Sequence, residues 1–250
     1  MRQDIGPLLT GWDYVPGELQ VRAITGAEDR RKIQIRTDLG LMQLEWTGRP
    51  DGSRPHDSIS LMDFHLERLR RCKSRGESFS LARPDCWALG REAVQYYWRR
   101  MSFFELKEYE LAESDALHNL SILDLCERFG EHAEDREVGE QFRVFVTTHR
   151  IQARALARLE EQDFAGALAA IDRGTLHLEG IVGERQGNPA DEECTELRFL
   201  RDWRLEVEAN RPRTEREQLT DALQTAVERE QFERAARLRD RLAALDGPGL

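Results

Sequence analysis

Hydrophobic and polar positions alternate only near the N-terminal end of the chain. Residues 19–25, 32–36 and 41–46 are short, partly alternating stretches separated by turn-forming segments. This pattern predicts a three-stranded antiparallel sheet. One face would carry the apolar side chains, which are Ile33, Ile35, Met42, Leu44 and Trp46. The other face would carry Lys32, Gln34, Arg36, Gln43 and Glu45.

A helix is predicted directly after the turn-rich loop at 48–57. Ser60 and Asp63 have the spacing of an N-terminal capping box. An apolar stripe follows at Leu61, Phe64, Leu66 and Leu69. A three-stranded sheet with one apolar face needs a covering element. We therefore expect this helix to cover the sheet, and residues 1–75 to form a small α+β unit.

From Pro84 onward the pattern is helical to the end of the chain. Pro84 suits a first helical turn, and helices are expected near 84–106, 108–129, 137–160, 163–183 and 192–209. Breaks fall at Phe129–Gly130, at Gln162–Asp163 and in the segment 183–193, which contains Gly187 and Pro189. Residues 84–210 are therefore predicted to form a stack of antiparallel helices.

Two of these junctions have similar local sequences. LKEYELA at 106–112 and LEEQDFAGA at 159–167 each place an aromatic residue after a polar turn, with an alanine three residues later. Residues 107–120 and 155–174 resemble the turn and second helix of the tetratricopeptide repeat. The matching positions are Phe103, Tyr109, Ala112, Ala155, Asp163, Phe164, Ala167 and Ile171. The two units begin about 55 residues apart, where tandem repeats begin about 34 apart, and Arg99, Arg154 and Arg158 occupy usually apolar positions. The region is repeat-like, and a plain helical bundle is the alternative.

A self-contained helical hairpin is predicted at 214–245. Thr214 and Glu217 have capping-box spacing, and Gly247–Pro248 would end the second helix. The apolar stripe contains Leu219, Leu223, Ala226, Phe232, Ala235, Ala236, Leu238, Leu242 and Leu245. From 235 its spacing runs three, four, three, as in a two-helix coiled coil. A hairpin of about 30 residues buries little surface by itself, which favours a binding element. The alternative is that it packs as the last hairpin of the same bundle.

The hairpin carries a family resemblance. LTDALQTAVEREQFERAARLRDRLAAL at 219–245 resembles the UVR motif of excision-repair subunits B and C. The resemblance implies protein–protein association, with partner-binding positions at Phe232, Glu233, Ala236, Arg239, Asp240 and Leu242. The chain lacks the phosphate-binding loop of a helicase, a recognisable nuclease core and the CxxC zinc sites of UVR-containing kinase activators. The remainder resembles bacterial proteins that carry a terminal UVR motif.

Composition narrows the class of protein. The chain has 250 residues, 40% hydrophobic and 34% charged, which is typical of an ordered, helix-rich fold. No apolar run approaches the roughly 20 residues of a membrane span, and no secretory segment is recognisable at the N-terminus. We expect a cytoplasmic protein without a membrane partner.

The four cysteines lie far apart in the sequence, so neither a metal site nor a cofactor is expected. They are Cys72, Cys86, Cys126 and Cys194.

The charge distribution argues against nucleic acid as a partner. The net charge is −10, and residues 83–210 hold 16 basic and 27 acidic residues. An acidic surface of this kind repels phosphates. The basic run Arg68, Arg70, Arg71, Lys73 and Arg75 is the exception. Cations near a helix C-terminus explain this run more simply than a phosphate site does.

Two polar groups are candidates for chemistry or binding. Arg99, Arg100, Asp115 and Asn119, with Asp124 nearby, could line a groove between the first two repeat-like helices. Interhelical salt bridges are the alternative explanation for these residues.

Asp38 and Glu45 suggest a metal-dependent nuclease strand, but a solvated sheet face explains them more simply. No catalytic motif is present, so we expect a protein that is not an enzyme.

These patterns together predict an α+β protein that is predominantly α. The expected function is a non-catalytic bacterial adaptor or scaffold that binds a protein partner through the hairpin, and through the groove as a second surface. Self-association into a homodimer is a further expectation, because hairpins of this kind can pair with their own copy. A DNA-repair-associated or nucleic-acid-binding accessory factor is the alternative.

Overall fold

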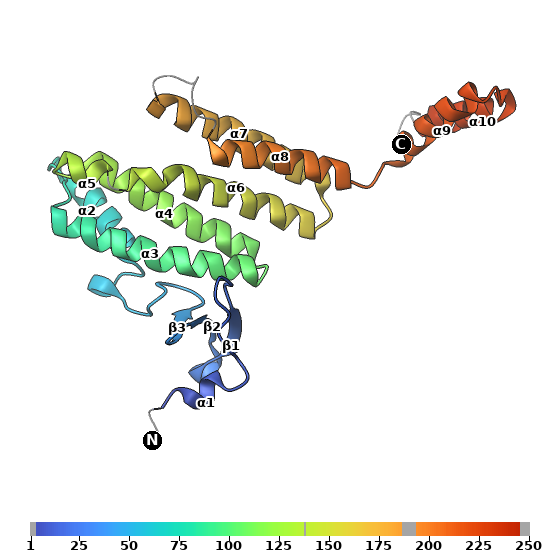
Figure 1. Ribbon diagram of the computed structural model, residues 1–250. Coiled ribbons are helices and arrows are strands. Elements are labelled where there is room, and N and C mark those ends of the chain that lie inside the picture. The colour runs from blue at the N-terminus through green and yellow to red at the C-terminus, as the bar shows by residue number, and fades with distance from the viewer. Residues whose placement is uncertain (1–3, 138, 187–193, 246–250) are drawn as a thin grey trace. The chain divides into compact units, whose positions relative to one another are not determined.

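The computed structural model describes residues 4–137, 139–186 and 194–245. The chain divides into two compact units, Met1–Arg204 and Leu205–Leu250. The first unit contains a small antiparallel sheet and most of the helices, and the second contains the C-terminal hairpin (Figure 1). The predicted class, α+β and predominantly α, is confirmed. No helix among the described residues is long and apolar enough to span a membrane.

The N-terminal sheet has the predicted strands. They are β1 (Val21–Thr25), β2 (Arg31–Thr37) and β3 (Gly40–Glu45), in the order β1-β2-β3 with both pairs antiparallel. Ile33 pairs with Leu44 and Ile35 with Met42, so the apolar side chains share one face as the alternation predicts. Two short helices lie next to the strands in the chain, α1 (Gly6–Leu9) and η1 (Ala27–Asp29). A third, η2 (Pro55–Asp57), contacts the helix that follows it.

The element that covers the sheet differs from the prediction. The buried face of the sheet packs on Phe103 of α3 (Arg83–Glu105), Ala112 of α4 (Tyr109–Phe129) and Ala153 of α6 (Arg143–Glu160). Trp46 and Phe103 meet edge to face, with 5.2 Å between the ring centroids. The helix at 61–75 was expected in this place. Side chains of three helices of the body take its place.

The helix at 61–75 exists and packs elsewhere. In α2 (Leu61–Arg75) Ser60 is the N-cap and accepts from the Asp63 amide, and Gly76 ends the helix with φ 68°. Its apolar side packs on α3 and α4, in a cluster of Leu61, Met62, Leu81, Cys86, Leu89, Ile122, Leu125 and Cys126. The sheet and α2 therefore each pack on the helical body. The division predicted at 75–84 does not coincide with the boundary between the two compact units.

The body is a series of antiparallel helices in which sequence neighbours lie side by side (Figure 1). It contains α3, α4, α6, α7 (Phe164–Gln186) and α8 (Thr195–Asn210). Ile151 of α6, Leu178 of α7 and Leu200 of α8 form one buried cluster that joins its last helices. The helix predicted at 137–160 starts later than expected. The chain before it forms α5 (Ala133–Glu137) and η3 (Glu140–Phe142) instead, on either side of Gly139.

Three helix–helix turns of the described chain share one backbone design. Each has a residue with φ between 56° and 60°; these residues are Lys107, Gln162 and Glu230. The following residue donates its amide to a carbonyl of the preceding helix, in the pairs Glu108–Phe103, Asp163–Arg158 and Gln231–Ala226, at 2.8–2.9 Å. An aromatic residue then begins the next helix; these residues are Tyr109, Phe164 and Phe232. The third turn lies between α9 (Glu215–Glu228) and α10 (Phe232–Leu245) of the hairpin.

Two expectations concern residues that the structure does not describe. The break containing Gly187 and Pro189 lies partly outside the described residues, which resume at Cys194. The stop at Gly247–Pro248 lies entirely outside them, and α10 is described to Leu245.

Candidate functional site: the C-terminal hairpin and a helical groove

The hairpin begins with a complete capping box. Thr214 accepts from the Glu217 amide, and the Glu217 carboxylate accepts from the Thr214 amide at 2.8 Å. Arg211 adds an ion pair to Glu217 at 2.5 Å. The Arg211 hydrogen bond, together with those from Thr214, lowers the pKa of Glu217 to about 2. The carboxylate therefore stays ionised at the positive end of α9 well into the acid range.

The two hairpin helices pack through small and apolar side chains. Leu219 and Ala226 of α9 are buried, and Ala235, Ala236, Leu238 and Leu242 of α10 are half-buried. Arg241 of α10 also pairs with Glu215 of α9 at 3.1 Å. No described residue of α10 is fully buried. The seam predicted by the apolar stripe therefore exists, and the hairpin leaves the outer side of α10 open.

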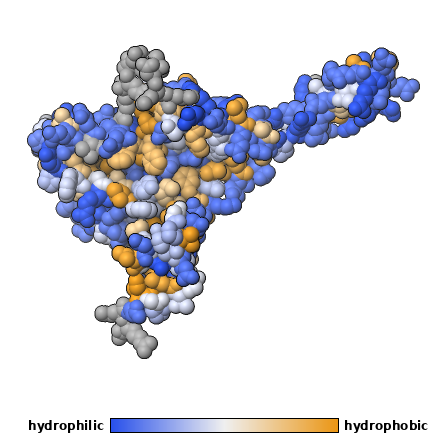
Figure 2. Space-filling model, viewed as in Figure 1, coloured by the Kyte–Doolittle hydropathy of each residue, from blue (hydrophilic) through white to orange (hydrophobic). Residues whose placement is uncertain are grey.

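The residues predicted to bind a partner divide into two sets. Phe232 is 70% exposed, and Glu233, Arg239 and Asp240 are exposed as well. Ala236 and Leu242 are half-buried in the seam, where they hold the two helices together. Most of the hairpin surface visible in Figure 2 is hydrophilic. An exposed phenylalanine on such a surface is a candidate anchor for a partner.

Comparison with the other two turns shows that Phe232 is unusual. Tyr109 and Phe164 occupy the same position in their turns and are both half-buried. The ring centroid of Tyr109 lies 6.3 Å from that of Phe104 on the preceding helix. Phe232 has the same backbone setting but is 70% exposed. Its greater exposure therefore does not come from a different turn.

The predicted polar cluster on α3 and α4 separates into two parts. Arg99 and Asp115 form a buried salt bridge, with Nε–Oδ2 at 2.8 Å and Nη2–Oδ1 at 2.7 Å. Arg99 Nη1 also donates to the Gly48 carbonyl at 2.6 Å. This pair ties α3, α4 and the segment after β3 together. For these two residues, the interhelical salt bridge is the correct explanation.

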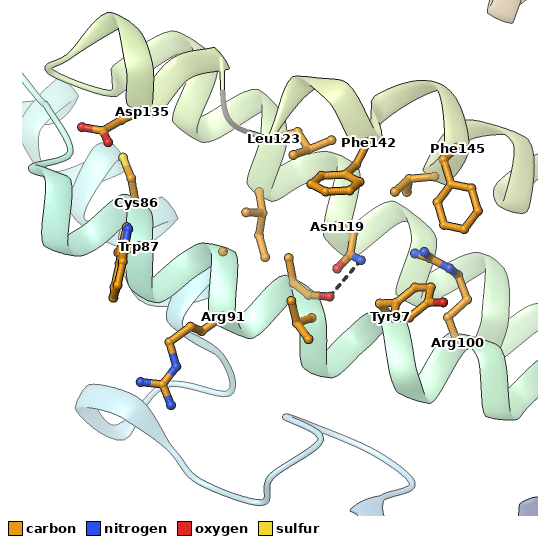
Figure 3. A pocket seen from close by; sticks show the side chains of 16 residues that line it. Cys86, Trp87, Arg91, Tyr97, Arg100, Asn119, Leu123, Asp135, Phe142 and Phe145 are labelled. Carbon is orange, nitrogen blue, oxygen red and sulfur yellow. Dashed lines mark hydrogen bonds between the residues drawn. The ribbon is translucent and has the colours of Figure 1, made fainter. Parts of the chain in front are cut away.

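Arg100 and Asn119 instead line a cavity of about 760 Å³ between α3, α4, η3 and the start of α6 (Figure 3). Consecutive residues on a helix differ in direction by about 100°, so Arg99 and Arg100 point to different sides of α3. The Asn119 amide donates to the Ala93 carbonyl at 3.1 Å, and Asp124 pairs with Arg143 at 2.6 Å. The cavity therefore contains two of the four residues that were predicted to line a groove.

One buried carboxylate has no signal in the sequence. Glu92 of α3 is fully buried and accepts from the amides of Leu61 at 2.8 Å and Met62 at 3.1 Å, the first residues of α2. Its carboxylate is also 3.1 Å from His118 and 3.2 Å from Arg49. Burial raises the pKa of Glu92, but the hydrogen bonds from His118 and the two amides outweigh it and lower the pKa overall. Glu92 looks like any helical glutamate in the sequence, and no local pattern marks it.

The remaining candidates have structural surroundings. Glu45 pairs with Lys32 across the sheet, and the Asp38 carboxylate accepts from the Leu39 amide at 2.9 Å. Within the described ranges, no group of three His, Cys, Asp or Glu residues could hold a metal ion. Cys86 and Cys126 are buried in the α2–α3–α4 cluster, and burial raises the pKa of both thiols, that of Cys126 to about 12.

The basic run on α2 is partly neutralised by nearby groups. Arg70 and Arg71 pair with Glu67, at 3.4 and 3.0 Å, and Arg68 lies 3.6 Å from Asp85. Lys73 and Arg75 lie in the last turn of the helix, where cations are favoured. This arrangement matches the interpretation of the run as a helix end.

Comparison with known protein families identifies the hairpin. Residues 213–247 match the UVR family, described as the UvrB/uvrC motif. The resemblance seen in the sequence is therefore confirmed for this segment. The motif suggests a UvrB/UvrC-related role in protein interaction or DNA repair. No curated protein and no solved structure matches the chain significantly.

Proposed function

We propose that this chain is a non-catalytic bacterial, cytoplasmic adaptor that binds a protein partner through its UVR hairpin. The observation that carries the proposal is Phe232, which is 70% exposed on a hairpin whose visible surface is mostly hydrophilic. At the same turn position in the body, Tyr109 and Phe164 are half-buried. A partner that packs beside α10 would supply the missing apolar neighbours.

The surroundings of Phe232 support protein recognition. Glu233 follows in the first turn of α10, and Arg239 and Asp240 lie further along the helix with exposed side chains. An apolar anchor with charged groups of both signs nearby is the usual composition of a protein-binding patch. The hairpin has 8 basic and 8 acidic residues between 211 and 250, which gives it no net attraction to nucleic acid. The tetratricopeptide-like helices of the body would then act as the scaffold that carries this patch.

The test compares capture of partner proteins by three forms of the full chain. The baits are the parent protein and the variants Phe232→Ala and Leu176→Ala. Each captured protein is then purified, and its binding to the three baits is measured. Leu176 of α7 is a matched control, because it is 72% exposed and lies outside the hairpin. We expect Phe232→Ala to weaken binding by tenfold or more and Leu176→Ala to leave it unchanged. Equal binding by Phe232→Ala and the parent would overturn the proposal.

Self-association uses the same patch in a second copy of the chain. Sedimentation of the parent and of Phe232→Ala at several concentrations separates this outcome from a different partner. A dimer that dissociates in Phe232→Ala would make a second copy the partner.

A DNA-repair-associated accessory factor is the second candidate, favoured by the match to the UvrB/uvrC motif. Direct DNA binding would have to use the basic run on α2, because residues 83–210 are acidic. The charge-reversed variant Arg68→Glu/Arg70→Glu/Arg71→Glu tests this role at low salt. We expect the parent to bind no DNA. Binding that the variant loses would favour the second candidate.

A further inference from the structure

The cavity between α3, α4, η3 and α6 contains a buried cation without an anion. Arg100 is 1% exposed, and its Nε and Nη1 atoms have no hydrogen-bond partner among the described residues. Its guanidinium lies 5.6 Å from the centroid of the Tyr97 ring. A buried charge without a hydrogen-bonded counter-ion destabilises a protein. Such a group persists where it has a function.

The nearby ionisable groups do not neutralise Arg100. The charge of Asp115 on α4 acts on Arg100, but both oxygens of that carboxylate accept hydrogen bonds from Arg99. On α6, burial and the charge of Arg100 lower the pKa of His149 to about 4, so this ring is neutral at pH 7. Asp135, also in the lining, is 3.3 Å from Arg83. The inner end of the cavity is therefore positive.

The rest of the cavity is apolar. Ile122 and Leu123 of α4, with Val146 of α6, form buried parts of its lining. Phe142 and Phe145 lie across the cavity from Tyr97 and Arg100 (Figure 3), and both rings are partly exposed. Trp87 and Val94 are exposed at its edge and mark the mouth. A volume of about 760 Å³ is in the range of small-molecule sites.

We propose that this cavity binds a small amphipathic carboxylate, with the anionic head on Arg100 and the apolar body along Phe142, Phe145 and Leu123. One guanidinium matches one monoanionic carboxylate, whereas a phosphate dianion would need a second cation. Arg91 also lines the cavity, but its guanidinium points away from it (Figure 3). A buried Asn119 Oδ1 without a donor is available to a hydroxyl or amide beside the head. The site is independent of the hairpin and of the function proposed for it.

The apolar walls favour a small molecule over an extended peptide. A peptide backbone carries one donor and one acceptor per residue, and each must be hydrogen-bonded when it is buried. The cavity lining offers two buried side chains with unpartnered polar atoms, Arg100 and Asn119. It therefore satisfies a single head group and not a chain of amides.

Isothermal titration of the full chain with decanoate and with decan-1-ol tests the proposal. The two probes share an apolar chain and differ in charge. We expect decanoate to bind at least about tenfold more tightly, because a charge-assisted hydrogen bond distinguishes the two. Arg100→Met should bind both probes with the affinity that the parent has for decan-1-ol. Arg91→Met, which removes a cation at the rim, should bind decanoate as the parent does.

A second pair of variants keeps the test decisive if Arg100→Met does not fold. Gly90 lies in the lining, and a side chain added there would meet open space. Gly90→Phe should fold and occupy the mouth, which would abolish binding of both probes. Gly90→Ala adds one methyl group and should bind as the parent does.

Three results would overturn the proposal: no binding of decanoate at millimolar concentration, equal affinity for decanoate and decan-1-ol, or equal losses in Arg91→Met and Arg100→Met. An amphipathic helical peptide with one glutamate is added as a competitor. We expect it to leave decanoate bound. Displacement of decanoate by the peptide at equal concentration would assign the cavity to a protein partner and would also contradict the proposal.

Discussion

Glu92 and Arg100 are buried charged residues on the same helix, and their environments differ completely. Glu92 receives hydrogen bonds from two backbone amides and lies beside His118 and Arg49. Arg100 keeps two buried nitrogens without a partner. A buried charge that is fully hydrogen-bonded contributes to the fold, whereas one left without partners costs stability. We therefore assign Glu92 to structure and Arg100 to binding.

Glu92→Gln is expected to destabilise the protein by roughly 2–3 kcal/mol, because it removes the charge that holds the first turn of α2. Urea unfolding at pH 7 measures the change. Glu67→Gln on α2 is the matched control, since the Glu67 side chain is 46% exposed and pairs with exposed arginines, and it should change stability by less than about 0.5 kcal/mol. A loss in Glu92→Gln no larger than in the control would contradict the structural role.

His149 should make stability depend on pH between about 4 and 6.5. Burial and the charge of Arg100 lower its pKa from 6.5 to about 4 in the folded state. The unfolded chain therefore binds a proton in this window that the folded protein does not, and stability falls as the pH falls from 6.5.

The free energy of unfolding is measured with urea at pH 7 and at pH 4.5. Between these two pH values the parent is expected to lose about 2 kcal/mol more than His149→Phe does. Carboxylates titrate equally in both proteins, so the difference isolates His149. If the free energy of unfolding changed equally with pH in the two proteins, the His149 ring would not be desolvated.

At the scale of elements, one turn design joins α3 to α4, α6 to α7 and α9 to α10. Each turn places a residue other than glycine at positive φ and starts the next helix with an aromatic residue. In the body, that aromatic residue is half-buried. In the hairpin it is Phe232, which is 70% exposed. The same local structure therefore gives a packing residue in one place and a candidate binding residue in the other.

Gln162→Gly is expected to stabilise the body by about 0.5–1 kcal/mol, because glycine adopts the left-handed conformation of this turn without a steric penalty. Thermal unfolding followed by circular dichroism measures the shift. Glu161→Gly, one residue earlier and at φ −80°, should destabilise instead. The same sign for both variants would argue against the turn geometry.

At the scale of the whole molecule, the chain consists of two compact units with separate apolar clusters. The first unit has the sheet cluster, the α2 cluster and the α6–α8 cluster. The second holds the hairpin, whose buried residues include Leu219 and Ala226 of α9. The UVR hairpin and the helical body are therefore separate compact parts of the chain.

Truncation to residues 1–211 is expected to leave the melting temperature of the body within about 2 °C of the parent, because the buried clusters of the first unit remain intact. Differential scanning calorimetry of both forms checks this. A large fall in the body transition would mean that the hairpin is part of its core.

Much of the fold follows from local pattern alone. Alternation around Ile33 and Ile35 predicts the strands and their buried face, because side chains of a strand alternate between two sides. Ser60 and Thr214 mark helix starts through hydrogen bonds to residues only three positions away. The hairpin was identified for the same reason, since its stripe and caps are local. The sequence also contains a third copy of the turn, EREQFERAA at 228–236, in addition to the two similar junctions that were predicted.

Only the tertiary structure decided which elements meet. Phe103 and Ala153 cover the sheet in place of the helix at 61–75, and residues 31 positions apart in the chain, Leu61 and Glu92, form one cap. The neighbouring residues Arg99 and Arg100 have opposite roles, one in a salt bridge and one in a cavity. Sequence periodicity fixes the face on which a residue lies, but burial and hydrogen bonding depend on long-range neighbours that no local pattern contains. For this protein, the sequence by itself therefore determined the elements and the UVR hairpin, and the packing of the helices alone decided where a buried charge was left without a partner.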